Sequence, residues 1–179
     1  MPTMQRVAIT GSTGLIGNAL VGHLKSEGYT VQRLVRRPSR SAEEITWDPQ
    51  AGTVDLEALA GVDAIIHLAG AGVGDKRWTK KYKSEILNSR LLGTTTIANA
   101  VNAVKPSVFI SASAIGWYGE TGNRAVVESD RAGEDFLAAV CREWEGAADL
   151  VKDVRTVKIR TGLVLDPTGG ALGRMLPLF

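Results

Sequence analysis

The sequence has little of the chemistry that metal sites and disulfide frameworks need. Its 179 residues include one cysteine and two histidines. The single cysteine, Cys141, excludes an internal disulfide, and its place in a helical apolar pattern predicts a packing role. His23 lies in an expected helix and His67 in an expected strand, where it is predicted to be a satisfied core histidine. The sequence therefore predicts no metal site.

Long apolar runs and an excess of one charge are also missing. No run of about 18 apolar residues occurs, so no membrane-spanning segment or membrane partner is expected. The N-terminus has no apolar signal-peptide core, which favours a cytoplasmic location. The net charge is only +2, which argues against a nucleic-acid partner. No G-x-S-x-G or Walker pattern is present, so hydrolase and NTPase functions have no support.

Short β-rich runs alternate with helical stretches, which predicts an α/β fold built on a doubly wound parallel sheet covered on both faces. The expected strands are 7–10, 30–35, 64–68, 108–112 and 156–165, and the expected helices are 15–27, 56–60, 80–104 and 134–152. A polar stretch, 36–44, interrupts this pattern. Residues 1–166 are predicted to form a Rossmann-like NAD(P)-binding domain. Residues 167–179 are predicted to begin a substrate-binding part that the chain otherwise lacks.

The glycine-rich segment after the first strand carries the strongest functional signal. It is a G-x-x-G-x-x-G run between a buried strand and an amphipathic helix. Its glycines allow a sharp turn, a close approach of backbone to pyrophosphate, and tight helix–strand packing. The N–H groups and dipole at the helix start favour the anion, although a turn without a ligand is the alternative. The predicted cofactor contacts are Gly11, Ser12, Thr13, Gly14, Leu15, Ile16 and Gly17.

The end of the second expected strand indicates which cofactor binds. A site for NAD usually places Asp or Glu there, whereas a site for NADP places Arg there. The sequence reads Val35-Arg36-Arg37 followed by proline, with no acid. Because a guanidinium can bind a phosphate through two N–H groups, these residues predict NADP(H) over NAD(H). A solvated basic turn is the alternative.

Several longer stretches resemble the extended and atypical branches of the short-chain dehydrogenase/reductase superfamily. The general likeness rests on ITGSTGLIG, HLAGAGV, ISASAIGWYG and RTGLVL. A closer likeness rests on ITWDP, RW-x(6)-EILNSRLLGT and EDFLAAVCREWEGAA. These resemble the NAD(P)-dependent epimerase/dehydratase-like subgroup, whose members are labelled nucleoside-diphosphate-sugar epimerases or "cell-division inhibitor" homologues. The resemblance covers essentially the whole chain, although members are typically longer.

The resemblance implies further cofactor contacts at matching positions. Strand ends would place some of them beside the adenine and ribose and others beside the nicotinamide, and the long helix would border the cofactor. The implied contacts are Leu68, Ala69, Gly70, Glu85, Arg90, Ser111, Ala112 and Val164. For Leu68 and Val164, plain core packing is an equal alternative.

The superfamily's usual catalytic pair is missing from this chain. Its reductases and epimerases carry a Tyr with a Lys four residues later, which exchange a proton while hydride moves. None of the three tyrosines here has such a lysine. Phe136 and Val140 take the two positions, and neither can move a proton. The superfamily's serine has a match in Ser113, and Tyr118 in the Gly-Trp-Tyr-Gly loop is an alternative acid.

Three functions remain open from the sequence. The first is an NADP(H)-dependent oxidoreductase or epimerase for a small polar substrate such as a nucleotide sugar, with Glu120 or Glu128 as alternative bases. The second is a non-catalytic NADP(H)-binding sensor or protein-interaction module. The third is a structural role in division control, which rests only on the subgroup label. Exposed apolar surface at the end of the domain would also allow a homodimer.

Overall fold

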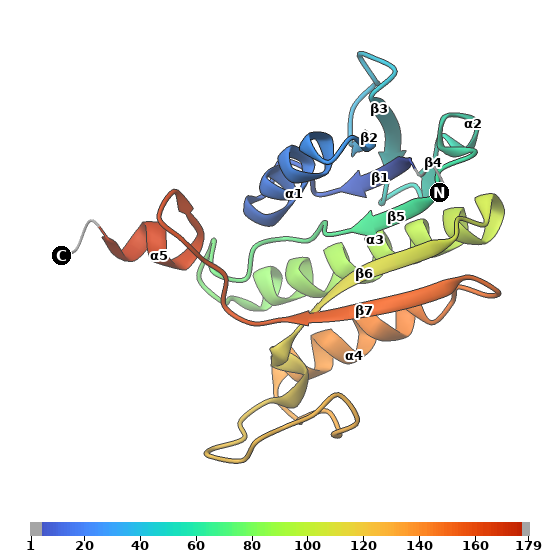
Figure 1. Cartoon of the computed structure of the whole chain (residues 1–179). Helices are drawn as coiled ribbons and strands as arrows, with labels where there is room; N and C mark the ends of the chain where they lie inside the picture. The colour runs from blue at the N-terminus through green and yellow to red at the C-terminus, as the bar shows by residue number, and fades with distance from the viewer. Residues whose placement is uncertain (1–4, 177–179) are drawn as a thin grey trace.

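The computed structural model describes residues 5–176, and a seven-stranded sheet forms its centre (Figure 1). Both ends of the chain, 1–4 and 177–179, lie outside the described residues, and with them the last part of the predicted substrate-binding start. The strands are β1 (Arg6–Thr10), β2 (Thr30–Val35), β3 (Glu44–Asp48), β4 (Thr53–Val54), β5 (Ala64–His67), β6 (Val108–Ala114) and β7 (Arg155–Thr161).

The order of the strands confirms the predicted doubly wound sheet. It reads β4-β3-β2-β1-β5-β6-β7, and every neighbouring pair is parallel except β3 with β4. The chain winds outward in one direction from β1 to β3 and in the other from β5 to β7. In such sheets ligands bind where the direction changes, outside the carboxyl ends of the strands. That place is next to β1 and β5.

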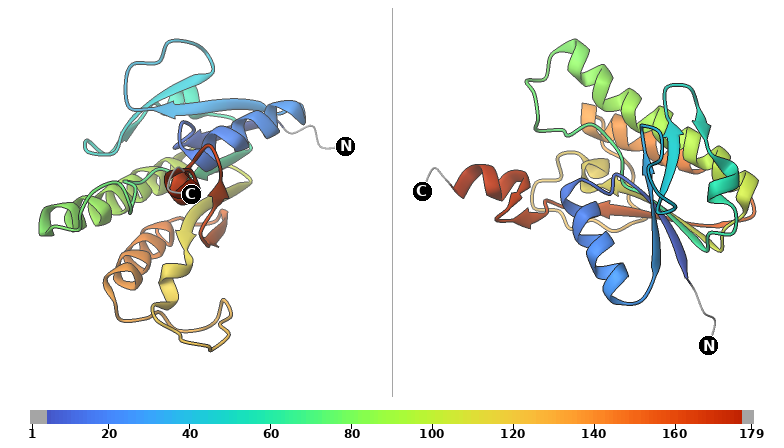
Figure 2. Two further views of the ribbon diagram at one scale, coloured as in Figure 1. Left: turned by 90° about the vertical axis from the view of Figure 1, so that its left-hand side faces the viewer. Right: turned by 90° about the horizontal axis from the view of Figure 1, so that it is seen from above.

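The helices divide unequally between the two faces of the sheet. They are α1 (Leu15–Ser26), α2 (Leu56–Leu59), α3 (Lys80–Val104), η1 (Ile115–Tyr118), α4 (Phe136–Ala148) and α5 (Gly170–Met175). Figure 2 shows α1 on one face and α3 beside α4 on the other. The expectation of two covered faces is therefore met only in part. On the side of α1, no helix of residues 5–176 covers β7, where Ile159 is 44% exposed.

Alternating side chains of the central strands build a core on each side of the sheet. Ile65 and Phe109, which are fully buried, pack against Ile97 on α3. On the other side Ile9 packs against Leu24 of α1. Successive residues of a strand point to opposite faces, and both faces of these strands are covered, so β1 and β5 consist almost entirely of buried residues. This packing fixes the carboxyl ends that form the candidate site.

Two parts of the architecture differ from the expectation. Strands β3 and β4 were not predicted, because β3 begins with a buried acid, Glu44, inside a polar stretch. The last long strand ends at Thr161, and the short strand β8 (Leu165–Asp166) leads into the unpredicted α5. Figure 1 places α5 beyond the carboxyl ends of the strands. There Arg174 donates to Asp75 at 2.8 Å.

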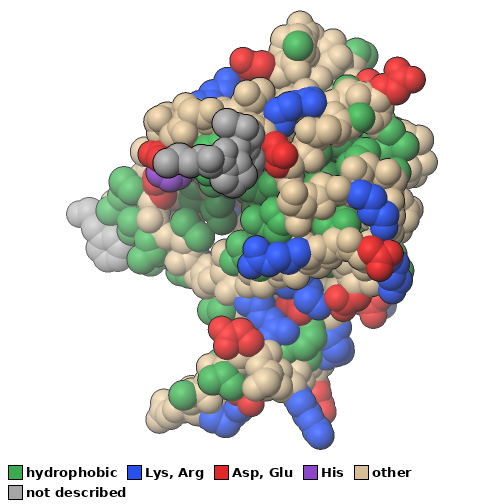
Figure 3. All heavy atoms as spheres, turned by 45° about the vertical axis from the view of Figure 1, so that its right-hand side comes forward, with side chains coloured by type: hydrophobic (Ala, Val, Ile, Leu, Met, Phe, Trp, Pro, Cys, Tyr) green, Lys and Arg blue, Asp and Glu red, His purple; other side chains and the backbone are tan. Residues whose placement is uncertain are grey.

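Basic and acidic side chains are interspersed on the face that Figure 3 shows. None of the helices within residues 5–176 is long and apolar enough to cross a membrane.

Candidate cofactor-binding site

The glycine-rich turn joins β1 to α1 with a geometry that only glycine accommodates. Gly11 has a φ of +67°, and its carbonyl accepts from the Gly14 N–H at 3.0 Å. A Cβ at Gly17 would lie 2.2 Å from the Gly11 oxygen, far inside van der Waals contact. The absence of side chains therefore lets the start of α1 lie directly against the turn, as the sequence predicts.

The start of α1 is open to a ligand. Gly14 is its N-cap, and no side chain caps the helix or adds an acid to its first turn. The backbone N–H groups of Leu15 and Ile16 have no acceptor among residues 5–176. Thr13 and Gly14 are exposed beside them. Uncapped N–H groups and the positive end of a helix dipole fit a pyrophosphate.

Thr10 and His67 hold the end of β5 against this turn, and sequence reasoning missed their role. The Thr10 hydroxyl accepts from the N–H groups of Leu68 at 3.0 Å and Ala69 at 3.2 Å. Its own hydrogen is then free for Nδ1 of His67, 2.7 Å away. His67 is fully buried, which lowers its pKa to about 3, so the ring is neutral. Its Nε2 has no partner among the described residues. The prediction that both polar atoms of this core histidine are hydrogen-bonded is therefore met for only one of the two ring nitrogens.

The two arginines after β2 have different environments. Arg36 is exposed and has no hydrogen-bond or ion-pair partner in residues 5–176. Arg37 donates from both terminal nitrogens to the carboxylate of Glu44, each at 2.7 Å. The same carboxylate accepts from the Arg40 N–H at 2.9 Å. Glu44 thus clamps the loop after β2 to β3, whereas Arg36 at this strand end has no partner among residues 5–176.

The clamp makes a pH-dependent contribution to stability. Hydrogen bonds from the Arg37 side chain and the Arg40 backbone lower the pKa of Glu44 from 4.5 to about 2. A carboxylate with a lowered pKa stabilises the folded state above its unfolded pKa and loses that contribution as the pH falls through the folded pKa. We expect the stability difference between wild type and Glu44→Gln in urea unfolding to be full at pH 6 and to shrink between pH 4.5 and 2. A difference unchanged over that interval would contradict the ion pair.

Ser113 and Tyr118 are brought into one network, although not as a substrate-facing pair. Ser113 is 2% exposed and donates to Glu145 on α4 at 2.6 Å. Arg160 on β7 donates to both carboxylate oxygens of Glu145, at 2.8 and 3.0 Å, and to the Tyr118 hydroxyl at 3.0 Å. Its guanidinium also lies 3.9 Å from the centre of the Trp117 ring. The Ser113 hydroxyl is therefore engaged inside the protein.

Glu145 is charged in this network. Burial raises its pKa, but hydrogen bonds from Arg160 and Ser113 outweigh that effect and leave the pKa below the ordinary value. The same pairing raises the pKa of Arg160. Sequence reasoning missed both residues, because a Glu on a helix and an Arg on a later strand have no spacing that indicates contact. The pair fixes the η1 turn to β7.

The other residues that the resemblance implies as cofactor contacts differ in their exposure and in their partners. Ser111 is 1% exposed and donates to the neighbouring Ala112 carbonyl at 3.2 Å. Glu85 is an exposed partner of Lys76 at 3.3 Å, on the outer surface of α3. Val164 is exposed after β7. Their contact with a cofactor stays a prediction.

The positions that the superfamily gives to Tyr and Lys are apolar here. Phe136 and Val140 pack with Tyr82 and Ile86 of α3. Phe136 also meets Trp78 edge to face, with ring centroids 5.5 Å apart. This cluster joins α3 to α4, and its one polar group, the Tyr82 hydroxyl, donates to the Gly72 carbonyl.

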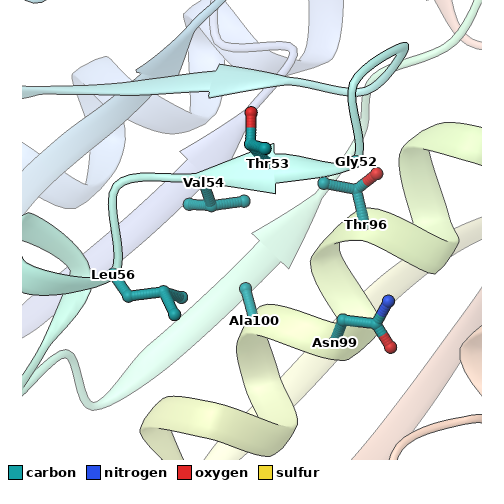
Figure 4. Close-up of a pocket in the computed structure, with 7 residues that line it drawn as sticks. All are labelled: Gly52, Thr53, Val54, Leu56, Thr96, Asn99 and Ala100. Atoms are coloured by element: carbon teal, nitrogen blue, oxygen red, sulfur yellow. The ribbon is translucent and has the colours of Figure 1, made fainter.

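Two hollows among the described residues lie away from the glycine-rich turn. One of about 250 Å³ lies between β4 and α3, and its lining includes Val54 and Leu56 as well as Thr96, Asn99 and Ala100 of α3 (Figure 4). The other, about 480 Å³, lies beside Tyr118 and the loop that includes Arg131. Only the second touches a predicted site residue, and neither includes the start of α1.

A match to a family profile shows to which protein family the chain belongs. The profile described as NAD dependent epimerase/dehydratase family matches residues 7–138. The chain belongs to this family. That result confirms the resemblance to atypical short-chain dehydrogenases/reductases, whereas the cell-division label stays a prediction.

Individual epimerase-family proteins are similar over nearly the whole chain. An epimerase family protein of Mycobacterium leprae is 43% identical over 175 residues, which are 97% of this chain and 57% of that protein. The crystal structure of human epimerase family protein SDR39U1 (isoform 2) with NADPH matches with a TM-score of 0.86 and 32% identity, over 97% of this chain and 59% of that one. The nucleoside-diphosphate sugar epimerase of Corynebacterium glutamicum matches with a TM-score of 0.85 and 37% identity, over 98% of this chain and 38% of that one. The chain thus spans less than two thirds of their length.

Proposed function

We propose that this epimerase-family chain binds NADP(H) at the glycine-rich turn and belongs to an oxidoreductase or epimerase for a small polar substrate. One observation carries the proposal. The uncapped start of α1 follows β1, and the neighbouring strand β2 leads into exposed Arg36, which has no partner among residues 5–176. Free N–H groups suit the pyrophosphate and a free guanidinium suits the 2′-phosphate. The NADPH in the human SDR39U1 structure supports the same choice of cofactor.

Tyr118 is the residue we assign to proton exchange. A bound nicotinamide supplies or accepts hydride, and the protein must then supply or accept a proton. A guanidinium can only donate, so Arg160 uses an oxygen lone pair of Tyr118 and leaves the phenolic hydrogen for another acceptor. The hollow beside Tyr118 offers room for a substrate. A nucleotide sugar is the substrate class we propose, since the similar Corynebacterium protein is a nucleoside-diphosphate sugar epimerase.

Arg36→Ala tests the cofactor assignment. We expect NADPH to bind more tightly than NADH to the wild type, measured by cofactor fluorescence. Loss of one charge-assisted phosphate contact should weaken NADPH binding about 10- to 100-fold and leave NADH binding unchanged. Arg142→Ala, an exposed arginine on α4, is the control and should change neither affinity. Equal binding of NADPH and NADH by the wild type would reject the assignment.

The apolar positions of Phe136 and Val140 favour a second candidate function, a non-catalytic NADP(H)-binding protein. A panel of nucleoside-diphosphate keto sugars with NADPH, followed by the loss of absorbance of the reduced cofactor, separates the two. Turnover that Tyr118→Phe abolishes supports the enzyme. Tight NADPH binding without turnover, in a protein that is as long as its relatives, supports the non-catalytic binding protein.

A further inference from the structure

The start of α3 carries a dense group of cations. Five of the eight residues from 76 to 83 are basic, namely Lys76, Arg77, Lys80, Lys81 and Lys83. No acidic residue lies in the first turn of the helix to balance them. Because the first turn of a helix carries partial positive charge, cations there are unfavourable for the helix itself. The arrangement produces a positive electrostatic potential at this helix start.

This helix start lies on the ligand side of the sheet. The helix α3 follows β5 and α4 follows β6, and these strands are parallel, so both helices begin beyond the carboxyl ends of the strands (Figure 1). In such a sheet ligands bind outside these ends. Arg36 follows β2, on the other side of the central strand β1. The starts of α3 and α4 therefore border the crevice at the end opposite to Arg36.

Lys83 differs from its basic neighbours in where its ammonium group lies. Its Nζ is 5.0 Å from the centre of the Phe136 ring on α4 and 5.7 Å from the centre of the Trp78 ring. The two rings meet edge to face, and Nε1 of Trp78 donates to the Val73 carbonyl at 2.8 Å. The ammonium is therefore held between the two helix starts by rings that are themselves fixed.

The ammonium of Lys83 has no acceptor among residues 5–176. The side chain is half-buried, and its contacts there are with the two rings. Other cations of this region are used inside the protein, since Lys76 pairs with Glu85 and Arg90 donates to two backbone carbonyls. An aromatic face attracts an ammonium but leaves its N–H groups free for oxygen acceptors. Lys83 therefore offers a positioned cation with unused donors.

We propose that Lys83 binds a phosphate group of the substrate and is thus the residue that holds the diphosphate of a nucleotide sugar. The proposal rests on the substrate class proposed above and names the residue that recognises its charge. The glycine-rich turn and Arg36 are the sites proposed for the anions of the cofactor, so the substrate diphosphate needs a cation of its own. Lysine binds phosphate as a point charge, and the neighbouring cations of α3 strengthen the field there.

Lys83→Met separates binding from packing. Methionine keeps an apolar contact with the Phe136 and Trp78 rings but has no charge. Lys83→Arg keeps the charge and can stack on the same rings. Lys81→Met is the matched control, because Lys81 is exposed in the same turn of α3 and its side chain has no hydrogen-bond or ion-pair partner among residues 5–176. The two methionine variants change the net charge equally, so a long-range charge effect would appear in both.

The experiment measures ligand affinity and melting temperature for the wild-type chain and the three variants. The probes are UDP-glucose alone, UDP-glucose with saturating NADPH, and NADPH alone. We expect Lys83→Met to bind UDP-glucose about 10-fold more weakly, and Lys83→Arg to stay within about 3-fold of the wild type. Lys81→Met should change that affinity by less than about 2-fold at physiological salt. NADPH alone should bind equally to all four proteins.

Four results overturn the proposal. They are an absence of UDP-glucose binding by the wild type, unchanged UDP-glucose affinity in Lys83→Met, an equal loss in Lys83→Met and Lys81→Met, and weaker binding of NADPH instead of UDP-glucose. A lower melting temperature of Lys83→Met with unchanged affinity would assign the lysine to packing. Failure of the proposed cofactor site is a separate outcome, because it appears in the wild type as an absence of NADPH binding. In that case UDP-glucose alone still decides for or against Lys83.

Discussion

Gly17→Ala is expected to destabilise the protein by about 3 kcal/mol and to abolish measurable NADPH binding. The new Cβ would lie 2.2 Å from the Gly11 oxygen and 2.8 Å from Cα of Ser12. Both are backbone atoms, so no side chain can move aside, and α1 must shift away from the turn. That shift moves the Leu15 and Ile16 N–H groups away from the place proposed for the pyrophosphate. Urea unfolding gives the stability, and cofactor fluorescence gives the affinity.

Gly22→Ala is the matched control on the same helix. Apart from its chain neighbours and the backbone of its own helix, no described atom lies within 4 Å of its added Cβ, and the position is exposed in the middle of α1. Alanine there should stabilise the protein by about 0.5–1 kcal/mol, because glycine loses more conformational freedom in a helix. NADPH affinity should not change. Equal effects of the two substitutions would show that the close approach at Gly17 is absent.

Glu145→Ala is expected to destabilise the protein by about 3–5 kcal/mol, because it leaves Arg160 as a buried charge without its partner. The Ser113 hydroxyl would lose its acceptor at the same time. Arg160 would then be held less firmly over the Trp117 ring, 3.9 Å away, so the tryptophan fluorescence of the folded state should change. The same loss should lower any activity that depends on the placement of Tyr118.

Glu143→Ala serves as the comparison for Glu145. Glu143 is exposed two residues earlier on α4 and has no hydrogen-bond or ion-pair partner within residues 5–176. Its replacement should change the free energy of unfolding by less than about 0.5 kcal/mol. The double variant Glu145→Leu with Arg160→Met removes both charges together. If it is no more stable than Glu145→Ala, the unpaired arginine is not the cause of the loss.

Much of the fold could be predicted from the sequence because local pattern and tertiary packing agree there. The helix over Lys80–Val104 was predicted with its observed bounds, since its apolar residues repeat at helical spacing. The strands β1 and β5 were predicted because each is a short, continuous apolar and β-rich run. The strand β3 was missed because its first residue, Glu44, is buried only through its ion pair with Arg37. An ion pair between two segments produces no pattern in the sequence of either segment alone.

Some features of the candidate site could likewise be predicted from residues close together in the sequence, whereas others depend on contacts between distant residues. The sequence by itself determined the turn from Gly11 to Gly17 and the absence of a Tyr–Lys pair, because each depends on residues close together in the chain. Only the tertiary structure decided that Arg37 is bound by Glu44 while Arg36 has no partner among residues 5–176, and that Ser113 donates to Glu145. Ion pairs and burial depend on what distant strands and helices bring alongside a residue. They exist only after the sheet has assembled and the helices have packed upon it.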